Sequence, residues 1–297
     1  MTGSHFPDFF IIGAPKCGTT SLALWLSGHP SVFMSEPKEP HYYSPELVPQ
    51  PSAKDEVEYH RLFASARAGQ KVGEASTGYL RSRVAVPRIL SDREDARLIV
   101  CLRNPVDMAR SAHAQLLKSG RLKERDFDTA WRMQESHLVA DGQERISDIC
   151  RVGAQVERLL SIASRDQVLF LLLEDIQAAP RDCYRTVLEF IGVEDDGRTV
   201  FPAVNTRALP RSIALARAAR VGHQIKRQMG ISRSLGLGRF IGKINNLSVK
   251  PAAAEVLPEL RQSLLETFQA DIERLEELIG RDLSHWRDSQ PPPMVNV

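Results

Sequence analysis

The chain contains 297 residues, of which 42% are hydrophobic and 26% are charged, with 39 basic and 37 acidic side chains. This composition excludes an intrinsically disordered chain, which has too few apolar residues to form a core, and also a fibrous or disulfide-rich chain. A formal net charge of +2 excludes the strongly positive overall field that is typical of nucleic-acid-binding proteins. The length is ample for a buried core, and we expect one domain over residues 1–297.

The apolar runs of the chain are short and unbroken, which is typical of buried parallel strands. In chain order, strands are predicted at Phe9–Ile12, Lys71–Glu74, Arg97–Leu102 and Val168–Leu173. Helices are predicted between and after them, at Thr20–Ser27, Val106–Lys118, Val152–Ala163, Arg181–Ile191 and Leu260–Ile279. Strands that alternate with helices predict a three-layer α/β/α fold with a central parallel sheet.

The cysteines and the N-terminal sequence bear on the cellular compartment. The four cysteines (Cys17, Cys101, Cys150 and Cys183) form no CxxC pair and have no histidine at a metal-binding spacing. We therefore expect neither a disulfide framework nor a metal site, and we expect a reducing compartment. The sequence begins without the basic and apolar regions of a signal peptide, and the apolar run Phe9–Ile12 is too short to cross a bilayer. These features predict a cytoplasmic protein without stable membrane insertion.

One stretch of the chain is strongly basic. Residues 197–254 include eleven Lys or Arg and no Asp or Glu, which leaves 28 basic and 37 acidic residues for the rest of the chain. Within this stretch, residues 211–250 are predicted to form basic helices and loops inserted before the last long helix. An anionic partner and a solvated basic face explain the asymmetry equally well. The C-terminal residues 288–297 are expected to form a flexible tail.

A glycine-containing turn follows the first predicted strand and leads into a helix. It includes Gly13, Lys16 and Gly18, and it is followed by Thr19 and Thr20. Such a turn directs several backbone N–H groups toward the positive end of the helix, where they can bind an anion. The glycine spacing matches a nucleotide-binding P-loop, but threonine replaces the lysine that follows the second glycine of a P-loop. Because the lysine lies inside the turn instead, the sequence favours a ligand whose charge develops near a 5′ phosphate.

Two segments of the chain resemble sulfotransferases that use 3′-phosphoadenosine 5′-phosphosulfate (PAPS). Phe10–Ser21 is similar to the loop of this family that binds the 5′-phosphosulfate group, and Arg97–Leu116 resembles its 3′-phosphate motif. In that motif an arginine closes a strand and a serine lies on the next helix, at positions held here by Arg103 and Ser111. The guanidinium of Arg103 provides a fork of donors, and Ser111 lies about two helical turns from Asn104, where it can face the same anion.

A third segment points to the heparan-sulfate branch of this family. Lys38–Tyr43, which reads Lys-Glu-Pro-His-Tyr-Tyr, resembles the Lys-Glu-x-His-Phe-Phe stretch of that branch. The resemblance implies that Glu39 is the catalytic base and that His41 lies beside it. Ala154–Gly192 and Pro258–Trp286 resemble the later parts of the family, so the similarity extends over most of the chain and implies a P-loop-like sulfotransferase fold.

The chain also departs from this branch. Members often carry Glu-Lys-Ser/Thr-Pro where this chain has Glu74-Ala75-Ser76-Thr77. The second active-site lysine is therefore absent, so either Glu74 and its neighbours have another role or Lys16 acts without that help. The Arg-Lys-Gly loop of cytosolic small-molecule sulfotransferases is also missing. Arg207 and Lys250 are candidates to complete the 3′-phosphate site by their charge and region alone.

The resemblance implies metal-independent transfer of a sulfuryl group from PAPS to a hydroxyl of a carbohydrate or small-molecule acceptor. Such a transfer needs a base for the acceptor proton and positive charge on the leaving phosphate. The resemblance assigns the first role to Glu39 and the second to Lys16. The other residues that it implies in donor binding within the turn are Cys17, Gly18, Thr19, Thr20 and Ser21.

Two alternatives stay open at the level of sequence. The first is a P-loop kinase for a small metabolite, which needs Mg²⁺, ATP and a lysine at the position of Thr19. The second is a non-catalytic, nucleotide-regulated protein that binds a polyanion or a membrane surface through its basic segment.

Overall fold

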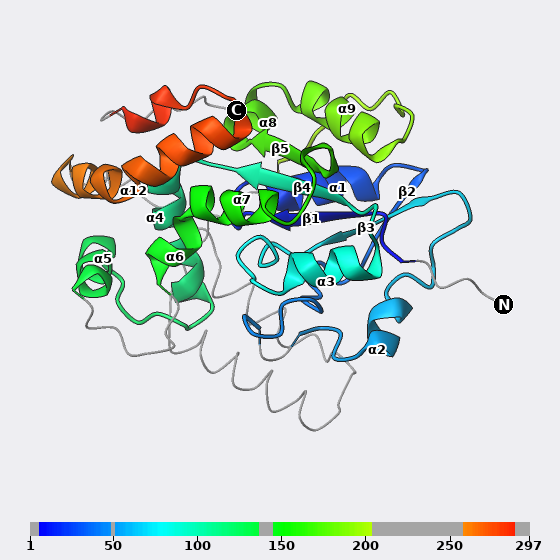
Figure 1. The fold of residues 1–297 in the computed structure, drawn as a ribbon, viewed down its shortest axis with the longest axis horizontal. Coiled ribbons are helices and arrows are strands. Elements are labelled where there is room, and N and C mark those ends of the chain that lie inside the picture. The colour runs from blue at the N-terminus through cyan, green and yellow to red at the C-terminus, as the bar shows by residue number, and fades with distance from the viewer. Residues whose placement is uncertain (1–5, 49–50, 137–144, 204–257, 289–297) are drawn as a thin grey trace. The chain divides into compact units, whose positions relative to one another are not determined.

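Figure 1 shows the computed structural model, which describes residues 6–48, 51–136, 145–203 and 258–288. The predicted basic insertion at 211–250, the candidates Arg207 and Lys250, and all of the predicted tail except Asp288 lie outside the described residues. The chain divides into two units. The first comprises Met1–Pro105, Arg151–Val204 and Gln269–Arg287, and the second comprises Val106–Cys150, Asn205–Phe268 and Asp288–Val297. The expectation of a single domain stays a prediction.

The first unit is built around a parallel sheet of five strands in the order β2-β3-β1-β4-β5. Its strands are β1 (Phe9–Gly13), β2 (Val32–Met34), β3 (Lys71–Ala75), β4 (Arg97–Leu102) and β5 (Val168–Leu172). All four neighbouring pairs are parallel. The four predicted strands are confirmed, and their ends differ from the prediction by one residue at most.

The edge strand β2 has no counterpart among the predicted strands. It is only three residues long and pairs with β3 alone. Phe33 and Met34 are only half-buried, and the apolar run of β2 is shorter than the runs that predicted β1, β4 and β5.

The position of β1 at the centre of the sheet explains its sequence. All five of its residues are buried, because β3 and β4 pair with it on either side and helices cover both faces. Phe9 pairs with Gly73 of β3, and a Cβ atom on Gly73 would overlap with the ring of Phe9. The glycine in β3 therefore makes room for an aromatic side chain in the central strand.

The helices of the first unit connect these strands. They are α1 (Thr19–Ser27), α2 (Glu56–Arg61), α3 (Ala85–Asp92), α7 (Val152–Leu160), α8 (Leu173–Ala178) and α9 (Pro180–Ile191), with 3₁₀ helices η1 (Arg165–Gln167) and η2 (Ser284–Arg287). The predicted helices at these places correspond to α1, α7 and α9, although α7 ends three residues earlier than predicted. The short helices α2, α3 and α8 have no predicted counterpart.

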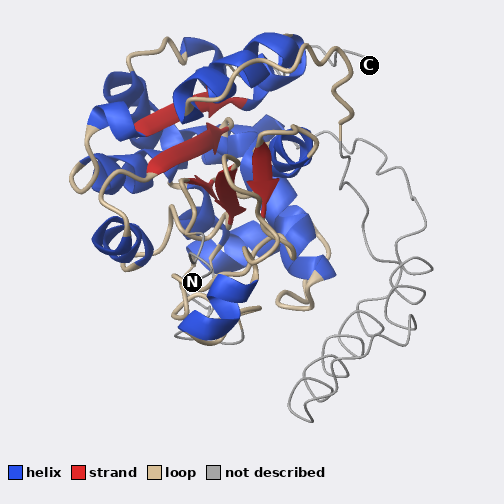
Figure 2. Cartoon of the chain, turned by 90° about the vertical axis from the view of Figure 1, so that its right-hand side faces the viewer, coloured by secondary structure: helices blue, strands red, loops and turns tan. Residues whose placement is uncertain are grey.

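The connections place helices on both faces of the sheet (Figures 1 and 2). The chain runs from β1 through α1 to β2, and then from β3 through α3 to β4 in the opposite direction, so right-handed crossovers put α1 and α3 on opposite faces. Trp25 of α1 packs on Phe201, which also packs on Tyr184 of α9. Arg158 of α7 donates to the carbonyl oxygen of Leu80, in the loop that joins β3 to α3, at 2.8 Å. The first unit therefore has the predicted three-layer α/β/α architecture.

The described part of the second unit is helical. It contains α4 (Pro105–Lys118), α5 (Phe127–Glu135), α6 (Ile146–Cys150) and the first half of α12 (Pro258–Ile279), whose second half belongs to the first unit. The predicted helices at Val106–Lys118 and Leu260–Ile279 correspond to α4 and α12. Trp131 of α5 packs against Phe268 of α12, with 5.7 Å between the ring centroids.

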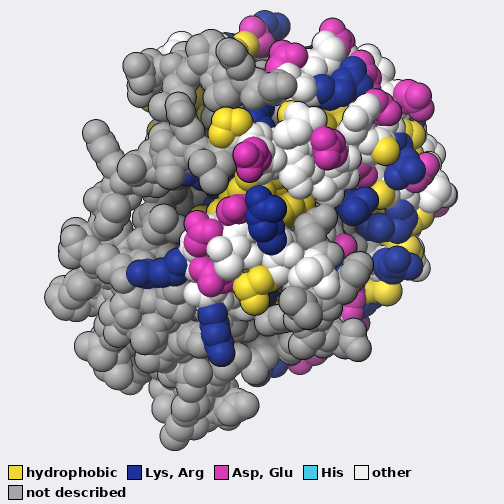
Figure 3. Space-filling model, turned by 90° about the vertical axis from the view of Figure 1, so that its left-hand side faces the viewer, with side chains coloured by type: hydrophobic (Ala, Val, Ile, Leu, Met, Phe, Trp, Pro, Cys, Tyr) yellow, Lys and Arg dark blue, Asp and Glu magenta, His cyan; other side chains and the backbone are white. Residues whose placement is uncertain are grey.

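Two properties of the described residues bear on partners. None of the described helices combines the length and the apolar character that a membrane-spanning helix requires. On the face shown in Figure 3, the described residues carry acidic and basic side chains interspersed with each other rather than one continuous patch of either sign.

Candidate active site

Two glycines shape the turn after β1. A Cβ atom on Gly13 would lie 2.6 Å from Cβ of Leu80, so the end of the strand has no room for a larger residue. Gly18 has a φ of 84° and is the N-cap of α1, in the left-handed region that favours glycine. Between the two glycines, the N–H of Ala14 donates to the carbonyl oxygen of Cys101 on β4 at 2.7 Å. The turn is therefore anchored at the carboxyl ends of both β1 and β4.

The N-terminus of α1 has the properties of an anion site. Gly18 has no side chain to cap the helix, and the first turn contains no acidic residue. The first backbone hydrogen bond of the helix runs from the N–H of Leu22 to the carbonyl oxygen of Gly18 at 3.2 Å, so the N–H groups of residues 19–21 precede the helical ladder. Lys16 adds a positive charge within the turn. This set of donors fits the phosphate end of a nucleotide such as PAPS.

The pKa of the buried Cys17 thiol shows which charges act on the turn. Burial raises the pKa of this thiol to about 12, while the charges of Arg103 and Lys16 lower it and that of Glu174 raises it. Arg103 follows β4, and Glu174 follows β5 in the first turn of α8. The carboxyl ends of β1, β4 and β5 therefore bring two cations and one carboxylate to the turn. Because the thiol stays protonated at neutral pH, the backbone is the part of Cys17 that can bind an anion.

The two predicted 3′-phosphate residues lie in different units. Arg103 is half-buried and directly follows β4, as predicted. Ser111 is half-buried and lies on α4 in the second unit. Their joint contact with one phosphate stays a prediction.

The segment that contains Glu39 and His41 is held against the carboxyl end of β3. The N–H of Glu39 donates to the carbonyl oxygen of Ala75 at 3.0 Å, and the N–H of His41 donates to Oγ of Ser76 at 3.1 Å. Glu39 and His41 have φ values of 68° and 55°, both in the left-handed region. The hydrogen bonds to β3 hold the segment in this uncommon conformation, which directs both side chains to the same place.

Three donors surround the carboxylate of Glu39. Its Oε1 accepts hydrogen bonds from Nζ of Lys38 at 2.9 Å and from Oγ1 of Thr77 at 3.2 Å, and its Oε2 lies 3.0 Å from Nε2 of His41. Burial raises the pKa of Glu39, but the hydrogen bond from His41 and the charge of Lys38 outweigh burial and lower it to about 2. The side chain is still 36% exposed. Glu39 is therefore an ionised and accessible carboxylate at neutral pH.

Glu74 has a different environment, although it lies in the adjacent strand β3. Its side chain is fully buried, and its Oε2 accepts hydrogen bonds from the hydroxyls of Tyr59 at 2.8 Å and Tyr79 at 3.0 Å. Burial raises the pKa of Glu74 to about 7, against the hydrogen bonds that it accepts. The hydroxyl of Tyr79 also accepts the N–H of Tyr43 at 3.3 Å. Glu74 therefore supports the segment that carries Glu39 and has no exposed surface for an acceptor.

The structure adds two residues to the site that the sequence did not single out. Lys38 and Thr77 both contact the same oxygen of Glu39. Their signal in the sequence was their position: Lys38 precedes the predicted base, and Thr77 is the second residue after β3. Parallel strands place the residues that follow them at one edge of the sheet, which is where ligands bind in such folds.

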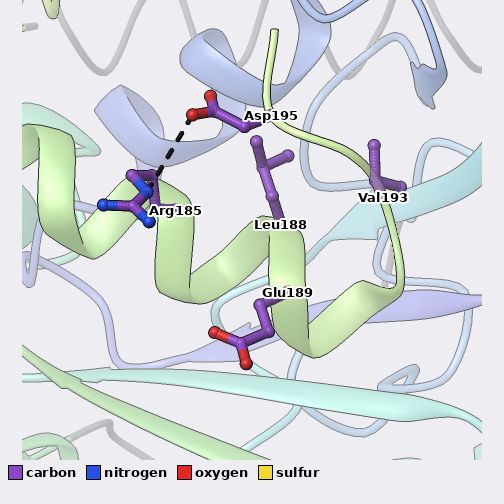
Figure 4. Close-up of a pocket in the computed structure, with 5 residues that line it drawn as sticks. All are labelled: Arg185, Leu188, Glu189, Val193 and Asp195. Carbon is purple, nitrogen blue, oxygen red and sulfur yellow. Dashed lines mark ion pairs between the residues drawn. The ribbon is translucent and has the colours of Figure 1, made fainter. Parts of the chain in front are cut away.

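A separate pocket of about 250 Å³ lies beside α9 (Figure 4). Its lining residues are Arg185, Leu188, Glu189, Val193 and Asp195. Nε of Arg185 lies 3.9 Å from Asp195, which also pairs with Arg181. No residue of the turn or of the Glu39 segment lines this pocket, so it does not belong to the candidate site.

Similarity to known proteins extends over most of the chain. The sulfotransferase domain family matches residues 6–206. Mouse heparan sulfate glucosamine 3-O-sulfotransferase 3B1 is 29% identical over 190 residues, which cover 64% of this chain. The chain spans about half of that relative, since the match covers 47% of its length.

Solved structures show the same similarity. The crystal structure of a sulfotransferase from Alicyclobacillus acidocaldarius superposes with a TM-score of 0.70 and 28% identity, covering 96% of this chain and 100% of that one. Mouse sulfotransferase SULT7A1 complexed with PAP shares the fold, with a TM-score of 0.50 and 12% identity over 92% of this chain and 87% of that one. Because the family match alone extends over more than half of its residues, the chain belongs to the sulfotransferase family.

Proposed function

We propose that this chain transfers the sulfuryl group of PAPS to a hydroxyl group of a carbohydrate or small-molecule acceptor. The observation that carries this proposal is the position of Glu39, an ionised and partly exposed carboxylate. Its backbone bond to Ala75 holds it at the end of β3, and β3 pairs with β1, whose end carries the anion-binding turn. A base and an anion site at adjacent strand ends suit a displacement between an acceptor and an anionic donor.

Each residue of the site has one task in this reaction. When bound, PAPS supplies an activated sulfuryl group and leaves as adenosine 3′,5′-bisphosphate. Lys16 and the N–H groups at the start of α1 hold the 5′ phosphate and stabilise the charge that grows on it. Arg103 and Ser111 hold the 3′ phosphate. Glu39 accepts the proton of the acceptor hydroxyl, and His41 orients that carboxylate through Nε2.

The comparisons support the choice of donor and acceptor. A protein with the same fold was solved in complex with PAP, the product expected from PAPS. A relative is named for 3-O-sulfation of heparan sulfate glucosamine, so we favour a carbohydrate hydroxyl among the possible acceptors. We also keep the prediction of a cytoplasmic protein, with which four buried cysteines that form no disulfide are compatible.

The sulfotransferase proposal is preferred to both alternatives. Thr19 stands where a P-loop kinase has its lysine, and the chain belongs to the sulfotransferase family. The non-catalytic alternative rests on the basic stretch at 197–254, most of which lies outside the described residues.

Nucleotide binding, measured as a shift in Tm, tests the proposal. Adenosine 3′,5′-bisphosphate should raise the Tm more than 5′-AMP does, because only the bisphosphate carries the 3′ phosphate. At a hundred times Kd the bisphosphate should stabilise the protein by roughly 2.7 kcal/mol. Equal shifts for the two nucleotides would remove the 3′-phosphate site, and a larger shift with Mg-ATP would favour the kinase.

Two arginines at opposite ends of β4 give this experiment a matched pair of variants. Arg103→Lys keeps the charge but loses the bidentate fork, so the bisphosphate should lose most of its advantage over 5′-AMP. Arg97→Lys is the control, because Arg97 is exposed and donates to the carbonyl oxygen of Asp166 at 2.7 Å. If both variants keep the full difference between the nucleotides, Arg103 does not bind the 3′ phosphate.

A further inference from the structure

The hydrogen bonds of Glu39 weaken it as a base. Its Oε1 accepts from Lys38 and Thr77, and its Oε2 lies beside Nε2 of His41. Each carboxylate oxygen has two lone pairs, so Oε2 can still accept the proton of a hydroxyl. A base works better, however, when its pKa is closer to the pH of the reaction, so the loss of one hydrogen-bond donor would strengthen Glu39.

Of these three hydrogen-bond donors, Lys38 is best able to move away from Glu39. Thr77 is only 7% exposed and lies at the end of β3. His41 is fixed by its N–H bond to Ser76, by the contact of its Nδ1 with Oγ of Ser44 at 3.3 Å, and by its ring contact with Tyr79. By contrast, the long side chain of Lys38 is 24% exposed. Within the described part of the chain, its ammonium makes one ion pair, with Glu39.

The charge of Lys38 also acts beyond Glu39. Burial raises the pKa of the Cys101 thiol above its usual range, and the charge of Lys38 lowers it, so the electrostatic influence of Lys38 extends to the end of β4. The carbonyl oxygen of Cys101 accepts the N–H of Ala14, the first residue of the turn. The charge of Lys38 thus acts both on the carboxylate of Glu39 and on the end of the strand that anchors the turn.

The neighbouring strand provides no cation at this place. The residue of β3 that bonds to the backbone of Glu39 is Ala75, whose side chain carries no charge. Lys16 belongs to the turn and faces the 5′ phosphate in the proposed function. The sulfuryl oxygens, which lie between the phosphate and the acceptor, therefore need a different cation.

We propose that Lys38 is a catalytic residue that changes partners, bonding Glu39 before the donor binds and the non-bridging sulfuryl oxygens of PAPS afterwards. The proposal rests on the proposed function, since it needs a sulfuryl donor. Lys38 keeps its proton throughout. The acceptor oxygen forms a bond to sulfur, its proton goes to Glu39, and the bond from sulfur to the bridging oxygen breaks with its electron pair passing to the phosphate. PAPS binding thereby removes the charged partner from Oε1 of Glu39 and leaves the Thr77 hydroxyl there, so that the base gains strength only when there is a sulfuryl group to transfer.

The experiment compares the affinities of PAPS and adenosine 3′,5′-bisphosphate by calorimetry, without acceptor. The two ligands differ by the sulfuryl group, so Lys38→Met should weaken PAPS binding about tenfold or more and leave bisphosphate binding within about twofold. Lys38→Arg, which keeps the charge, should restore part of the affinity for PAPS. Lys71→Met is the control, because Lys71 starts β3 at its other end and pairs with Asp8 at 3.9 Å.

The other outcomes overturn the inference. Equal weakening of both ligands by Lys38→Met would place Lys38 on a phosphate. If neither affinity changes and the acidic limb of the single-turnover pH profile moves to higher pH in Lys38→Met, Lys38 only lowers the pKa of Glu39. Failure of the wild-type protein to bind the bisphosphate would instead remove the proposed function on which the inference rests, so the two failures are distinguishable.

Discussion

Two glutamates at the carboxyl end of β3 have pKa values that are shifted in opposite directions. Glu39 bonds through its backbone to Ala75, and Glu74 directly precedes Ala75 in the chain. Glu39 keeps 36% of its side chain exposed and contacts Lys38 and His41. Glu74 is fully buried, and the partners of its Oε2 are tyrosine hydroxyls. The pKa of Glu39 is lowered to about 2, whereas that of Glu74 is raised to about 7.

The difference between the two carboxyls comes from their partners rather than from burial alone. Burial raises the pKa in both cases. At Glu39 a lysine and a histidine outweigh burial, but at Glu74 the hydrogen bonds of neutral hydroxyls do not. Glu39 is therefore fully ionised at neutral pH, while Glu74 is divided between its two protonation states. The comparison supports the proposed role of Glu39 as the base and indicates a supporting role for Glu74.

The largest effect should come from removing the charge of Glu39. Glu39→Gln keeps the size of the side chain but removes the basic carboxylate, so the single-turnover rate should fall by about 10²–10⁴-fold. The affinity for adenosine 3′,5′-bisphosphate should stay nearly constant, since the proposed phosphate contacts are elsewhere. Glu36→Gln, an exposed position in the same segment, is the control for both measurements. A near wild-type rate in Glu39→Gln would place the base elsewhere, with His41 as the next candidate.

The second effect concerns stability and should appear at Glu74. The ordinary pKa of a glutamate is 4.5, and that of Glu74 in the folded protein is about 7. The folded state therefore binds more protons, and the contribution of Glu74 to stability decreases as the pH rises from 4.5 to 7. Glu74→Gln cannot titrate. Relative to that of the wild type, the unfolding free energy of this variant should therefore rise by roughly 3 kcal/mol as the pH is raised from 4 to 8.

Glu39→Gln provides the contrast for this measurement. The pKa of Glu39 is lowered on folding, so its contribution to stability is present above pH 4.5 and is lost as the pH falls toward 2. Denaturation of both variants across the pH range should thus give opposite trends in separate windows. If the difference between Glu74→Gln and the wild type does not depend on pH, Glu74 is ionised in the folded state and the comparison fails.

Sequence patterns predicted the parts of this molecule that depend on local signals. Unbroken apolar runs identified β1, β4 and β5, and the glycines of the turn predicted its place between β1 and α1. The edge strand β2 was missed because its apolar run, Val32–Met34, is only three residues long. The burial of Glu74 was also missed, because both faces of a central parallel strand are covered and alternation gives no signal.

The contacts of Glu39 could not be predicted for a different reason. They depend on how one segment folds back onto the end of β3, through the backbone bonds of Glu39 and His41 to Ala75 and Ser76. A motif names the residues that stand next to each other in the chain. It does not say that Thr77, 38 positions later, donates to the same oxygen as Lys38.

The smallest effect should come from Thr77, whose hydroxyl is the uncharged donor to Glu39. Thr77→Val keeps the shape of the side chain and removes one hydrogen bond to the carboxylate, while Lys38 and His41 remain. The pKa of Glu39 should rise by less than about one unit, which a carboxyl titration followed by ¹³C NMR can measure. Thr186→Val is the control, because the Thr186 hydroxyl donates to the carbonyl oxygen of Asp182 on α9. If the pKa of Glu39 is unchanged in Thr77→Val, the charged partners alone account for the difference in pKa between Glu39 and Glu74. If that pKa rises as much as it does in Lys38→Met, the charged partners do not account for the difference alone.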